Sequence, residues 1–433
     1  MISHLLDDHW LAALAQYDTL YVGYSGGLDS TVLLHLLSQQ PQLKPKISAV
    51  HVHHGLSPDA DAWQVHCALF CRAQGIAFSA ARVTIPGDTN LEAHAREARY
   101  RIFSSRLTPQ DALVLAHHCD DQAETLLLHL FRGCGVDGLA AMRAITPFSG
   151  ATIVRPLLDK RREVLQAYAQ SHVLAWVDDE SNQDIGFSRN YLRHVVLPLI
   201  EKQWPGVVTT LVRSAAHCQQ AKQNLEALAQ LDCPDLCHHT GTLPLASLSA
   251  FSRARLVNVL RLWLQQCEQP CPTTALLSRI IDEVILARED AHPSVEWGEV
   301  AVKRYQDQLY LVFKNQIALA PMPQVWSNFP EACSITGFGY VHAIPSNAGL
   351  PVPAQGHLEI RFRQGGEQMV WHGQTKSLKK LLQQWRVPPW LRGQVPLLFL
   401  DEQLVAVVGY AMSDTHDQEG GGLTYQFSFL PER

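Results

Sequence analysis

The chain has 433 residues, 47% hydrophobic and 18% charged, which excludes fibrous and disordered classes and predicts a globular protein of two or three domains. Its formal net charge of −6 argues against a protein that coats nucleic acid without specificity. The opening MISHLLDDHW lacks a basic start and a long apolar run, and no later stretch approaches the roughly 18 apolar residues of a membrane span. We therefore expect a cytoplasmic protein with no membrane partner.

The first third alternates short β-branched or aromatic runs with helical patterns. Strands are predicted over 20–24, 47–52, 78–85 and 112–116, and helices over 31–37, 59–74 and 91–107. Repeated β-α units predict an α/β fold with a doubly wound parallel sheet. Ligands of such sheets bind beyond the carboxyl ends of the strands.

The composition changes after Trp204-Pro205-Gly206, so we predict that a first domain covers residues 1–206. Helical patterns over 207–231, 248–267 and 274–289 predict a helical middle domain, residues 207–320. A proline-rich, weakly patterned stretch, 321–355, is interpreted as a linker to a small α+β domain of short strands and one basic helix, 356–433.

The ten cysteines are too sparse for a disulfide scaffold and are expected to be reduced thiols. Cys233, Cys237, His238 and His239 resemble a loose zinc cluster, but the spacing is wider than a C-x-x-C knuckle and no partner pair stands out. Packing on a helix face beside a polar loop is the preferred interpretation.

A glycine loop lies directly between the first strand and the next helix, with the sequence Ser25-Gly26-Gly27-Leu28-Asp29-Ser30. Its two glycines permit backbone angles that turn consecutive N–H groups toward an anion at the helix N-terminus. The two serines add hydroxyl donors, and an acid within a phosphate loop indicates magnesium. The loop is neither a Walker loop nor a dinucleotide G-x-G-x-x-G motif. The simpler alternative is a strand-to-helix turn with a serine cap.

The loop resembles the pyrophosphate loop of N-type ATP pyrophosphatases, which adenylate a carbonyl oxygen and release pyrophosphate. The loop alone leaves GMP, NAD and argininosuccinate synthesis and tRNA thiolation open. Further motifs in their order resemble the tRNA(Ile)-lysidine synthetase family. They are Val52-His53-His54-Gly55-Leu56, Glu97-Ala98-Arg99-Tyr100, His117-His118-Cys119-Asp120-Asp121-Gln122-Ala123-Glu124-Thr125, Ile153-Val154-Arg155-Pro156-Leu157-Leu158, Asp179-Glu180-Ser181-Asn182, Arg189-Asn190-x-x-Arg193, Lys379-Lys380-Leu381 and Val387-Pro388-Pro389-Trp390-Leu391-Arg392.

This resemblance implies an ATP-dependent ligase that needs magnesium. Its substrates would be L-lysine and the isoleucine tRNA with a CAU anticodon, both the middle and the C-terminal domain contacting the tRNA. Lysine's side-chain amine would join C2 of the wobble cytidine through an adenylated base, so that the codon read changes from AUG to AUA. The tRNA base must be unstacked to react, which is easier in a loop than in a duplex.

The resemblance also implies roles for individual side chains. Asp29 would serve magnesium and the phosphates, and His51 would mark the adenine position through its backbone. Asp121 and Glu124, three residues apart, would hold the incoming lysine, and a nearby acid or histidine would take its proton. The full catalytic set is Asp29, His117, Asp120, Asp121, Glu124 and Arg189, with Ser25, Gly26, Gly27, Leu28, Asp29, Ser30 and His51 binding ATP.

Asp120 is expected to cap the helix that follows it, and Arg189 to stabilise charge on the α-phosphate. A tight transition-metal site at His117, His118, Asp120 and Asp121 is the less favoured interpretation. A cap plus a solvated helix face is the alternative for the acids.

Basic residues suggest where tRNA would bind. Between residues 360 and 392 the only acid is Glu367, so this segment is a candidate polyanion surface. Solvated surface charge is the alternative interpretation. The expected tRNA contacts are Arg96, Arg99, Arg193, Lys376, Lys379, Lys380 and Arg392.

Two competing functions remain at this stage. A tRNA thiolase would need a placed catalytic cysteine or an iron–sulfur C-x-x-C, yet Cys119 and Cys134 are isolated. A non-catalytic tRNA-binding or ATP-sensing protein would not need the acids beside the loop.

Overall fold

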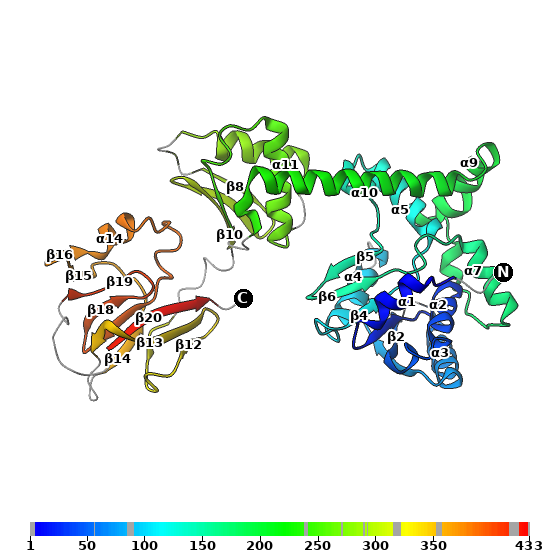
Figure 1. Ribbon diagram of the computed structural model, residues 1–433, viewed down its shortest axis with the longest axis horizontal. Coiled ribbons are helices and arrows are strands. Elements are labelled where there is room, and N and C mark those ends of the chain that lie inside the picture. Colours follow the sequence, from blue (N-terminus) through cyan, green and yellow to red (C-terminus); the bar gives the residue numbers. More distant parts are fainter. Residues whose placement is uncertain are drawn as a thin grey trace. The chain divides into compact units, whose positions relative to one another are not determined.

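The computed structural model describes residues 5–55, 57–84, 91–237, 241–269, 272–288, 291, 293–314, 322–351, 357–414 and 424–431. The chain divides into two compact units, residues 1–225 and 226–433 (Figure 1). The division falls within the long helix α10 (Val207–Asp232). The domain borders expected at residues 206, 320 and 355 stay predictions.

A six-stranded sheet forms the centre of the N-terminal unit, in the order β3-β2-β1-β4-β6-β5. Neighbours pair parallel, except that β5 and β6 form an antiparallel edge hairpin. The predicted α/β fold with a mostly parallel sheet is confirmed, but the hairpin was not predicted. The strands are β1 (Leu20–Gly23), β2 (Ile47–His53), β3 (Ala77–Arg82), β4 (Ala112–Val114), β5 (Ile145–Phe148) and β6 (Ala151–Val154).

Helices cover both faces of this sheet. Buried residues of α1, α2, α3 and α7 pack on one face, and α4 packs on the other through Phe103. A third core joins α5 to the helical run that leads into α10. The helices are α1 (Asp8–Ala15), α2 (Leu28–Ser38), η1 (Lys44–Lys46), α3 (Ala60–Gln74), α4 (Leu91–Ser104), α5 (Cys119–Phe131), α6 (Val136–Leu139), α7 (Arg162–Ser171), η2 (Glu180–Gln183), α8 (Ser188–Tyr191), the π-helical η3 (Leu192–Val196) and α9 (Leu197–Gln203).

Strand β2 extends one residue further than predicted. His53 therefore lies within the strand, as His51 does. Their side chains explain the extension, because His51 Nδ1 lies 3.0 Å from the Tyr24 carbonyl oxygen and His53 Nε2 lies 3.0 Å from Asp61.

The middle part of the chain is not purely helical, contrary to the prediction. Helices α11 and α12 pack on an antiparallel sheet of order β7-β10-β9-β8. The strands were missed because residues 294–313 had been assigned to a helical domain, although they contain β-branched residues typical of strands, such as the buried Val295, Val300 and Val302. The elements are η4 (Pro234–Cys237), β7 (Thr242–Pro244), α11 (Arg253–Gln266), α12 (Thr274–Arg279), the π-helical η5 (Ile280–Ile285), β8 (Ser294–Trp297), β9 (Val300–Tyr305) and β10 (Gln308–Phe313).

Most of the stretch predicted to be a linker is sheet. It contains β11 (Gln324–Val325), β12 (Cys333–Ile335) and β13 (Gly339–Pro351), and β13 pairs with β20 (Thr424–Pro431). Pro345 suggested a break, but it lies where the register between β13 and β20 shifts, a position at which a sheet tolerates proline. Residues 321 and 352–355 of the predicted linker lie outside the described residues.

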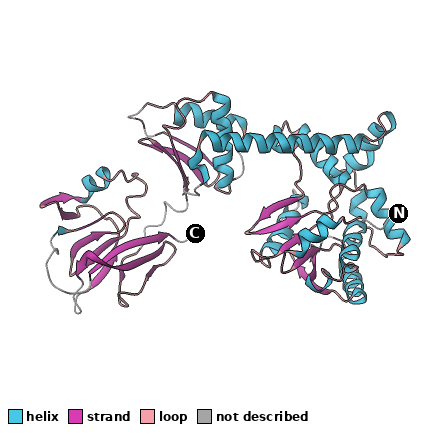
Figure 2. Cartoon of the chain, viewed as in Figure 1, coloured by secondary structure: helices cyan, strands magenta, loops and turns pink. Residues whose placement is uncertain are grey.

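Antiparallel strands dominate the rest of the C-terminal unit (Figure 2). One sheet has the order β11-β14-β17-β18-β19, and a hairpin, β15-β16, lies beside it with helix α14. The elements are β14 (Leu358–Arg361), β15 (Gln368–Trp371), β16 (Gln374–Ser377), α14 (Leu378–Gln384), β17 (Leu397–Leu400), β18 (Gln403–Val407) and β19 (Ala411–Met412).

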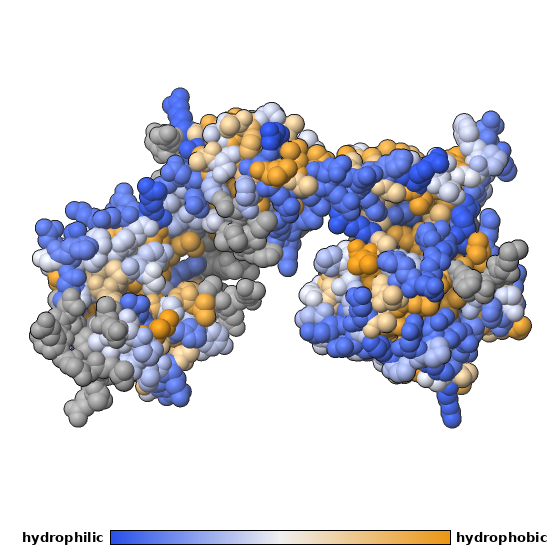
Figure 3. All heavy atoms as spheres, viewed as in Figure 1, coloured by the Kyte–Doolittle hydropathy of each residue, from blue (hydrophilic) through white to orange (hydrophobic). Residues whose placement is uncertain are grey.

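Hydrophilic side chains cover most of the visible face of the N-terminal unit, with separate apolar patches among them (Figure 3). Among the described residues, no helix is both long enough and apolar enough to cross a membrane.

The finding that β13 belongs to a core yields a stability prediction. Val341 is fully buried in β13, and the neighbouring Tyr340 is 45% exposed. Val341→Ala should lower the free energy of unfolding by about 2 kcal/mol, because it removes two buried methyl groups and leaves a cavity. Tyr340→Ala should change it by less than about 0.5 kcal/mol. Urea unfolding followed by tryptophan fluorescence measures both, and equal, small effects would mean that the segment is a linker after all.

Candidate active site

Steric limits and hydrogen bonds fix the conformation of the glycine loop. Gly26 has a φ of +88°, and a Cβ there would lie 2.8 Å from Cys67 Sγ, so glycine is required on both grounds. The Gly26 carbonyl accepts hydrogen bonds from Val177 N at 2.9 Å and from Thr31 Oγ1 at 3.2 Å. Val177, which sequence reasoning missed, thus joins a distant segment to the loop.

The serines of the loop line the N-terminus of α2. Ser25 Oγ lies 3.0 Å from Ser30 Oγ and accepts a hydrogen bond from Gly27 N at 3.3 Å. Ser30 Oγ donates to the Gly27 carbonyl at 3.0 Å. Leu28 is buried and anchors the first turn. The hydroxyl groups and the first-turn N–H groups of the helix form a seat for an anion.

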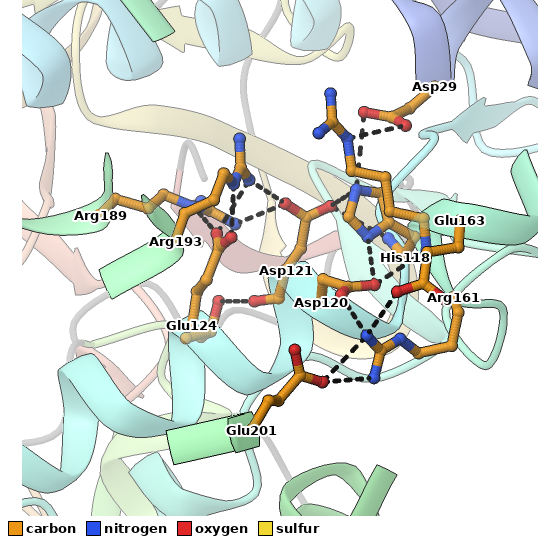
Figure 4. Close-up of polar contacts among 12 residues, drawn as sticks. Asp29, His118, Asp120, Asp121, Glu124, Arg161, Glu163, Arg189, Arg193 and Glu201 are labelled. Atoms are coloured by element: carbon orange, nitrogen blue, oxygen red, sulfur yellow. Dashed lines mark hydrogen bonds and ion pairs between the residues drawn. The ribbon is translucent and has the colours of Figure 1, made fainter. Parts of the chain in front are cut away.

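A buried carboxylate between two arginines lies beyond β4 (Figure 4). Glu124 is fully buried, and its oxygens accept from Arg189 Nε and Arg193 Nε, each at 2.6 Å. Asp121 Oδ1 accepts from Nη2 of both arginines, each at 3.0 Å. Burial alone would lower the pKa of both guanidinium groups, but the two carboxylates raise them. The pairing keeps both arginines charged and fixes α5 against α8 and η3.

His118 connects this pair to the glycine loop (Figure 4). Its ring is 1% exposed, with Nε2 lying 3.4 Å from Asp121 and 3.5 Å from Asp29, and Nδ1 lying 3.5 Å from Asp120. Burial lowers its pKa, but the surrounding carboxylates, Asp121 first, raise it to about 10. His118 is therefore an imidazolium that holds three acids together. It lies within the quoted histidine motif, yet sequence reasoning selected only its neighbour, His117.

Asp29 extends from the glycine loop toward this cluster. Its carboxylate lies 3.5 Å from His118 and 3.8 Å from Arg162. The Oδ1 atom is buried and has no hydrogen-bond partner among the described residues. An oxygen in this state suits a further donor or a cation.

Asp120 does not cap its own helix, so that expectation was wrong. Helix α5 begins after His118, whose N–H donates to Asp121 Oδ2 at 3.0 Å. Asp120 instead accepts from the Arg162 N–H at 2.9 Å, at the start of α7. It also pairs with Arg161 at 3.3 Å, which binds Glu201 at 3.1 Å. No local pattern indicates Arg161 or Glu201, because the two residues are 40 positions apart and Asp120 is about equally distant from Arg161 along the chain.

His117 is half-buried beside the cluster, and the burial of its ring lowers its pKa to about 3. At neutral pH it is thus an uncharged imidazole that can form hydrogen bonds but is a weak base. The positive charge of the exposed Arg96 side chain of α4 also lowers this pKa.

Histidines of β2 and α3 lie near the loop. His51 uses its ring to bind the Tyr24 carbonyl, so the ring is occupied within the fold. His66 Cδ2 lies 4.0 Å from the position of a Cβ on Gly26, and its buried Nε2 has no hydrogen-bond partner among the described residues. Burial, and then Arg99, lower the pKa of His54 to about 4. His66 was missed because nothing in the sequence links α3 to the loop.

A pocket of about 230 Å³ opens beside Glu124. Acidic and basic side chains both line it, and α9 contributes apolar side chains to its wall. Its lining includes Asp120, Glu124, Arg161, Arg162, Glu163, Gln166, Arg193, His194, Leu197, Pro198, Glu201 and Val208.

The predicted tRNA contacts of the tail lie in the other unit. Lys379 and Lys380 are exposed on α14, whereas Lys376 Nζ lies over the Trp371 ring, 4.7 Å from its centroid. Arg392 donates to the Val387 carbonyl at 2.9 Å and to the Tyr305 hydroxyl at 3.0 Å.

The tail is less basic than the count between 360 and 392 indicated. Arg361 pairs with Glu402 and with Glu359, which lies one residue outside that window.

The structure describes only part of the loose zinc cluster. Cys233 is 2% exposed within the core of the middle part, whereas His238 and His239 lie outside the described residues.

Comparisons with known proteins cover nearly the whole chain. Family models match as a PP-loop domain over residues 2–200, a TilS substrate binding domain over 243–310 and a TilS substrate C-terminal domain over 358–427. The chain is 48% identical over 415 residues to a tRNA(Ile)-lysidine synthase of Legionella pneumophila (strain Paris), covering 96% of each chain.

More distant proteins are also similar. A tRNA(Ile)-lysidine synthase of Salmonella heidelberg (strain SL476) is 38% identical, covering 94% of this chain and 96% of that protein. A solved U34-tRNA thiolase from Methanococcus maripaludis is 18% identical with a TM-score of 0.41, covering 47% of this chain and 73% of that one. With a phosphate loop, a buried acid–arginine cluster and relatives aligned along nearly their full length, the chain belongs to the tRNA(Ile)-lysidine synthase family.

Proposed function

We propose that this ATP-dependent ligase joins the side-chain amine of L-lysine to C2 of the wobble cytidine in an isoleucine tRNA with a CAU anticodon. AMP and pyrophosphate leave, and the codon read changes from AUG to AUA. The observation that carries the proposal is the continuous chain of charged groups from Asp29 of the loop, through His118, to Asp121 and Glu124. This chain supports a site in which a triphosphate seat and an amine-binding region lie together. We further propose that the enzyme works in the cytoplasm, where its three substrates occur together.

ATP binding is assigned to the loop, with Ser25, Gly26, Gly27, Leu28, Asp29 and Ser30 around the phosphates and the backbone at His51 near adenine. Magnesium fits the unpartnered Oδ1 of Asp29. Among the described residues no group of three or more His, Cys, Asp or Glu side chains is arranged around a metal, so Asp29 would hold the ion together with phosphate oxygens. The ion would offset negative charge on the departing pyrophosphate.

The first step we propose is attack of the cytosine O2 on the α-phosphate, with release of pyrophosphate. Arg189 is 24% exposed, so part of its guanidinium group still faces the site while Glu124 and Asp121 fix its orientation. A guanidinium group held in this way can stabilise charge on the α-phosphate without reorganising during the reaction.

In the second step the lysine amine attacks C2 and the C2–O2 bond breaks, with AMP as the leaving group. We propose that lysine enters the pocket beside Glu124, where Asp120 and Glu201 supply partly exposed carboxylates. Asp121 and Glu124 contribute through the arginines they hold as well as by their own charge. The neutral His117 is a hydrogen-bond partner here, since its low pKa makes it a weak base.

The tRNA contacts we propose are Arg96, Arg99 and Arg193 around the reacting base, and Lys376, Lys379, Lys380 and Arg392 in the tail. Burial is the main cause of the lowered pKa of His51 and of His54. The positive charge of the nearby Arg99 lowers both pKa values further. Arg392 donates hydrogen bonds to Val387 and Tyr305, so its main role would be structural and its contact with tRNA the smaller part.

The thiolase alternative requires a reactive cysteine near the site. Cys119 is 3% exposed, and burial raises the pKa of its thiol to about 11. A thiol in this state is a poor nucleophile at neutral pH. A protein that only bound ATP and tRNA would not need the linked carboxylates.

Asp29→Asn should reduce pyrophosphate release that depends on tRNA and lysine by roughly 100-fold, because it removes the negative charge at the phosphates. The melting temperature should stay within a few degrees, since the side chain is 30% exposed and lies in the first turn of α2. Asp18→Asn, at an exposed acid outside the site, is the matched control. Normal turnover of the Asp29 variant would remove this residue from the chemistry.

Asp121→Asn and Glu124→Gln should each raise the KM for lysine at least tenfold while changing the KM for ATP by less than about threefold. Both changes also leave a guanidinium group without a full partner, so a melting curve accompanies the kinetics. Glu283→Gln is the matched control, since Glu283 also pairs with an arginine, Arg279, but lies in the other unit. Equal increases for both substrates would point to phosphate handling instead of lysine recognition.

A further inference from the structure

Three aromatic side chains gather on the C-terminal domain where the β15-β16 hairpin, α14 and the residues after β18 meet. The rings of Trp385 and Tyr410 stack, with centroids 5.7 Å apart and an interplanar angle of 20°. Trp371 contacts Trp385 edge-on at 5.6 Å. The inner sides of Trp371 and Trp385 pack on the core, whereas Tyr410 is 47% exposed. We call Trp371, Trp385 and Tyr410 the aromatic platform.

Lysines lie on the hairpin and the helix that carry Trp371 and Trp385. Lys376 Nζ lies 4.7 Å from the centroid of the Trp371 ring, and Lys379 and Lys380 are exposed on α14. Two acids of the same region accept hydrogen bonds from the backbone: Asp414 from Gly373 N at 2.7 Å, and Glu367 from Gly365 N at 2.7 Å. Within the part of the chain that the structure describes, none of the three lysines forms an ion pair with an acid.

An exposed aromatic stack bordered by lysines has the chemistry of a site for single-stranded nucleic acid. Bases stack on aromatic rings while ammonium groups contact the phosphates that follow. A protein partner would more often meet an apolar surface with charged residues depleted from its centre. A duplex offers no free base face, so the occupant is an unpaired nucleotide.

We propose that the aromatic platform binds an unpaired base at the 3′ end of the tRNA. This inference rests on the proposed function, which makes tRNA the substrate. In a folded tRNA the bases of the two loops at its corner stack on one another, and the anticodon loop is needed at the catalytic site. The single-stranded 3′ end remains as the segment with free base faces.

The test measures the affinity of the full-length protein for two transcripts of the tRNA, one complete and one without its unpaired 3′ nucleotides. Tyr410→Ala should weaken binding of the complete tRNA at least fivefold, the lower range for loss of a base–aromatic stack. It should leave binding of the truncated tRNA unchanged, and wild type should bind truncated tRNA as weakly as the variant binds complete tRNA. Tyr410→Phe keeps the ring and should bind like wild type.

The lysines provide an electrostatic comparison. Replacing Lys376, Lys379 and Lys380 by alanine should weaken binding of the complete tRNA and reduce its salt dependence, by roughly one unit of slope per lost phosphate contact. Tyr410→Ala should leave the salt slope unchanged.

Tyr340→Ala, at an exposed tyrosine of the same unit, controls for general effects of losing an aromatic side chain. Equal losses for complete and truncated tRNA, or no loss, would overturn the proposal for the 3′ end. Lysine incorporation at saturating tRNA distinguishes failure of the 3′-end proposal from failure of the proposed function. Absence of incorporation in wild type would contradict the proposed function itself.

Discussion

The structure of the catalytic site depends on one buried carboxylate. Glu124 is fully buried and is neutralised by two guanidinium groups that come from residues 65 and 69 positions later in the chain. An isolated charge in that position would be costly, and removing one partner of a buried pair typically costs about 3–5 kcal/mol. The interaction therefore fixes α5, which begins just beyond strand β4, against α8 and η3. This pairing is what holds the two arginines at the edge of the sheet.

The same interaction orders the rest of the site. Asp121 shares both arginines, and the His118 imidazolium then links Asp121 to Asp120 and to Asp29 of the loop. Carboxylates and cations alternate, so the site holds many charges close together with little net repulsion. Such an arrangement is oriented before substrates bind, which is the main contribution a protein can make to nucleotidyl transfer. Under the proposed function, it would also accommodate an anionic ATP and a cationic lysine in neighbouring places.

Sequence reasoning was strong where local pattern determines structure. Alternating β and α patterns predicted the parallel sheet, and the spacing of Gly26, Gly27 and Ser30 predicted a strand–loop–helix turn whose geometry requires glycine at Gly26. It failed where partners are distant. Arg161 and Glu201 meet Asp120 only through the fold, and the acids that neutralise Arg361 lie outside the basic segment. The strand around Pro345 was not predicted, because a proline usually indicates a break in a strand. Only the pairing with the partner strand shows that Pro345 lies where the register shifts. The roles of individual site residues remain proposals for the same reason.

The most direct test of the account follows the fate of lysine. The protein is incubated with ATP, labelled lysine and bulk bacterial tRNA, the labelled nucleotide is mapped, and AMP and pyrophosphate are counted. The account predicts label at the wobble cytidine of the tRNA with a CAU anticodon, with one AMP and one pyrophosphate released for each lysine attached. Label at another nucleotide, or ATP cleavage without lysine attachment, would contradict it.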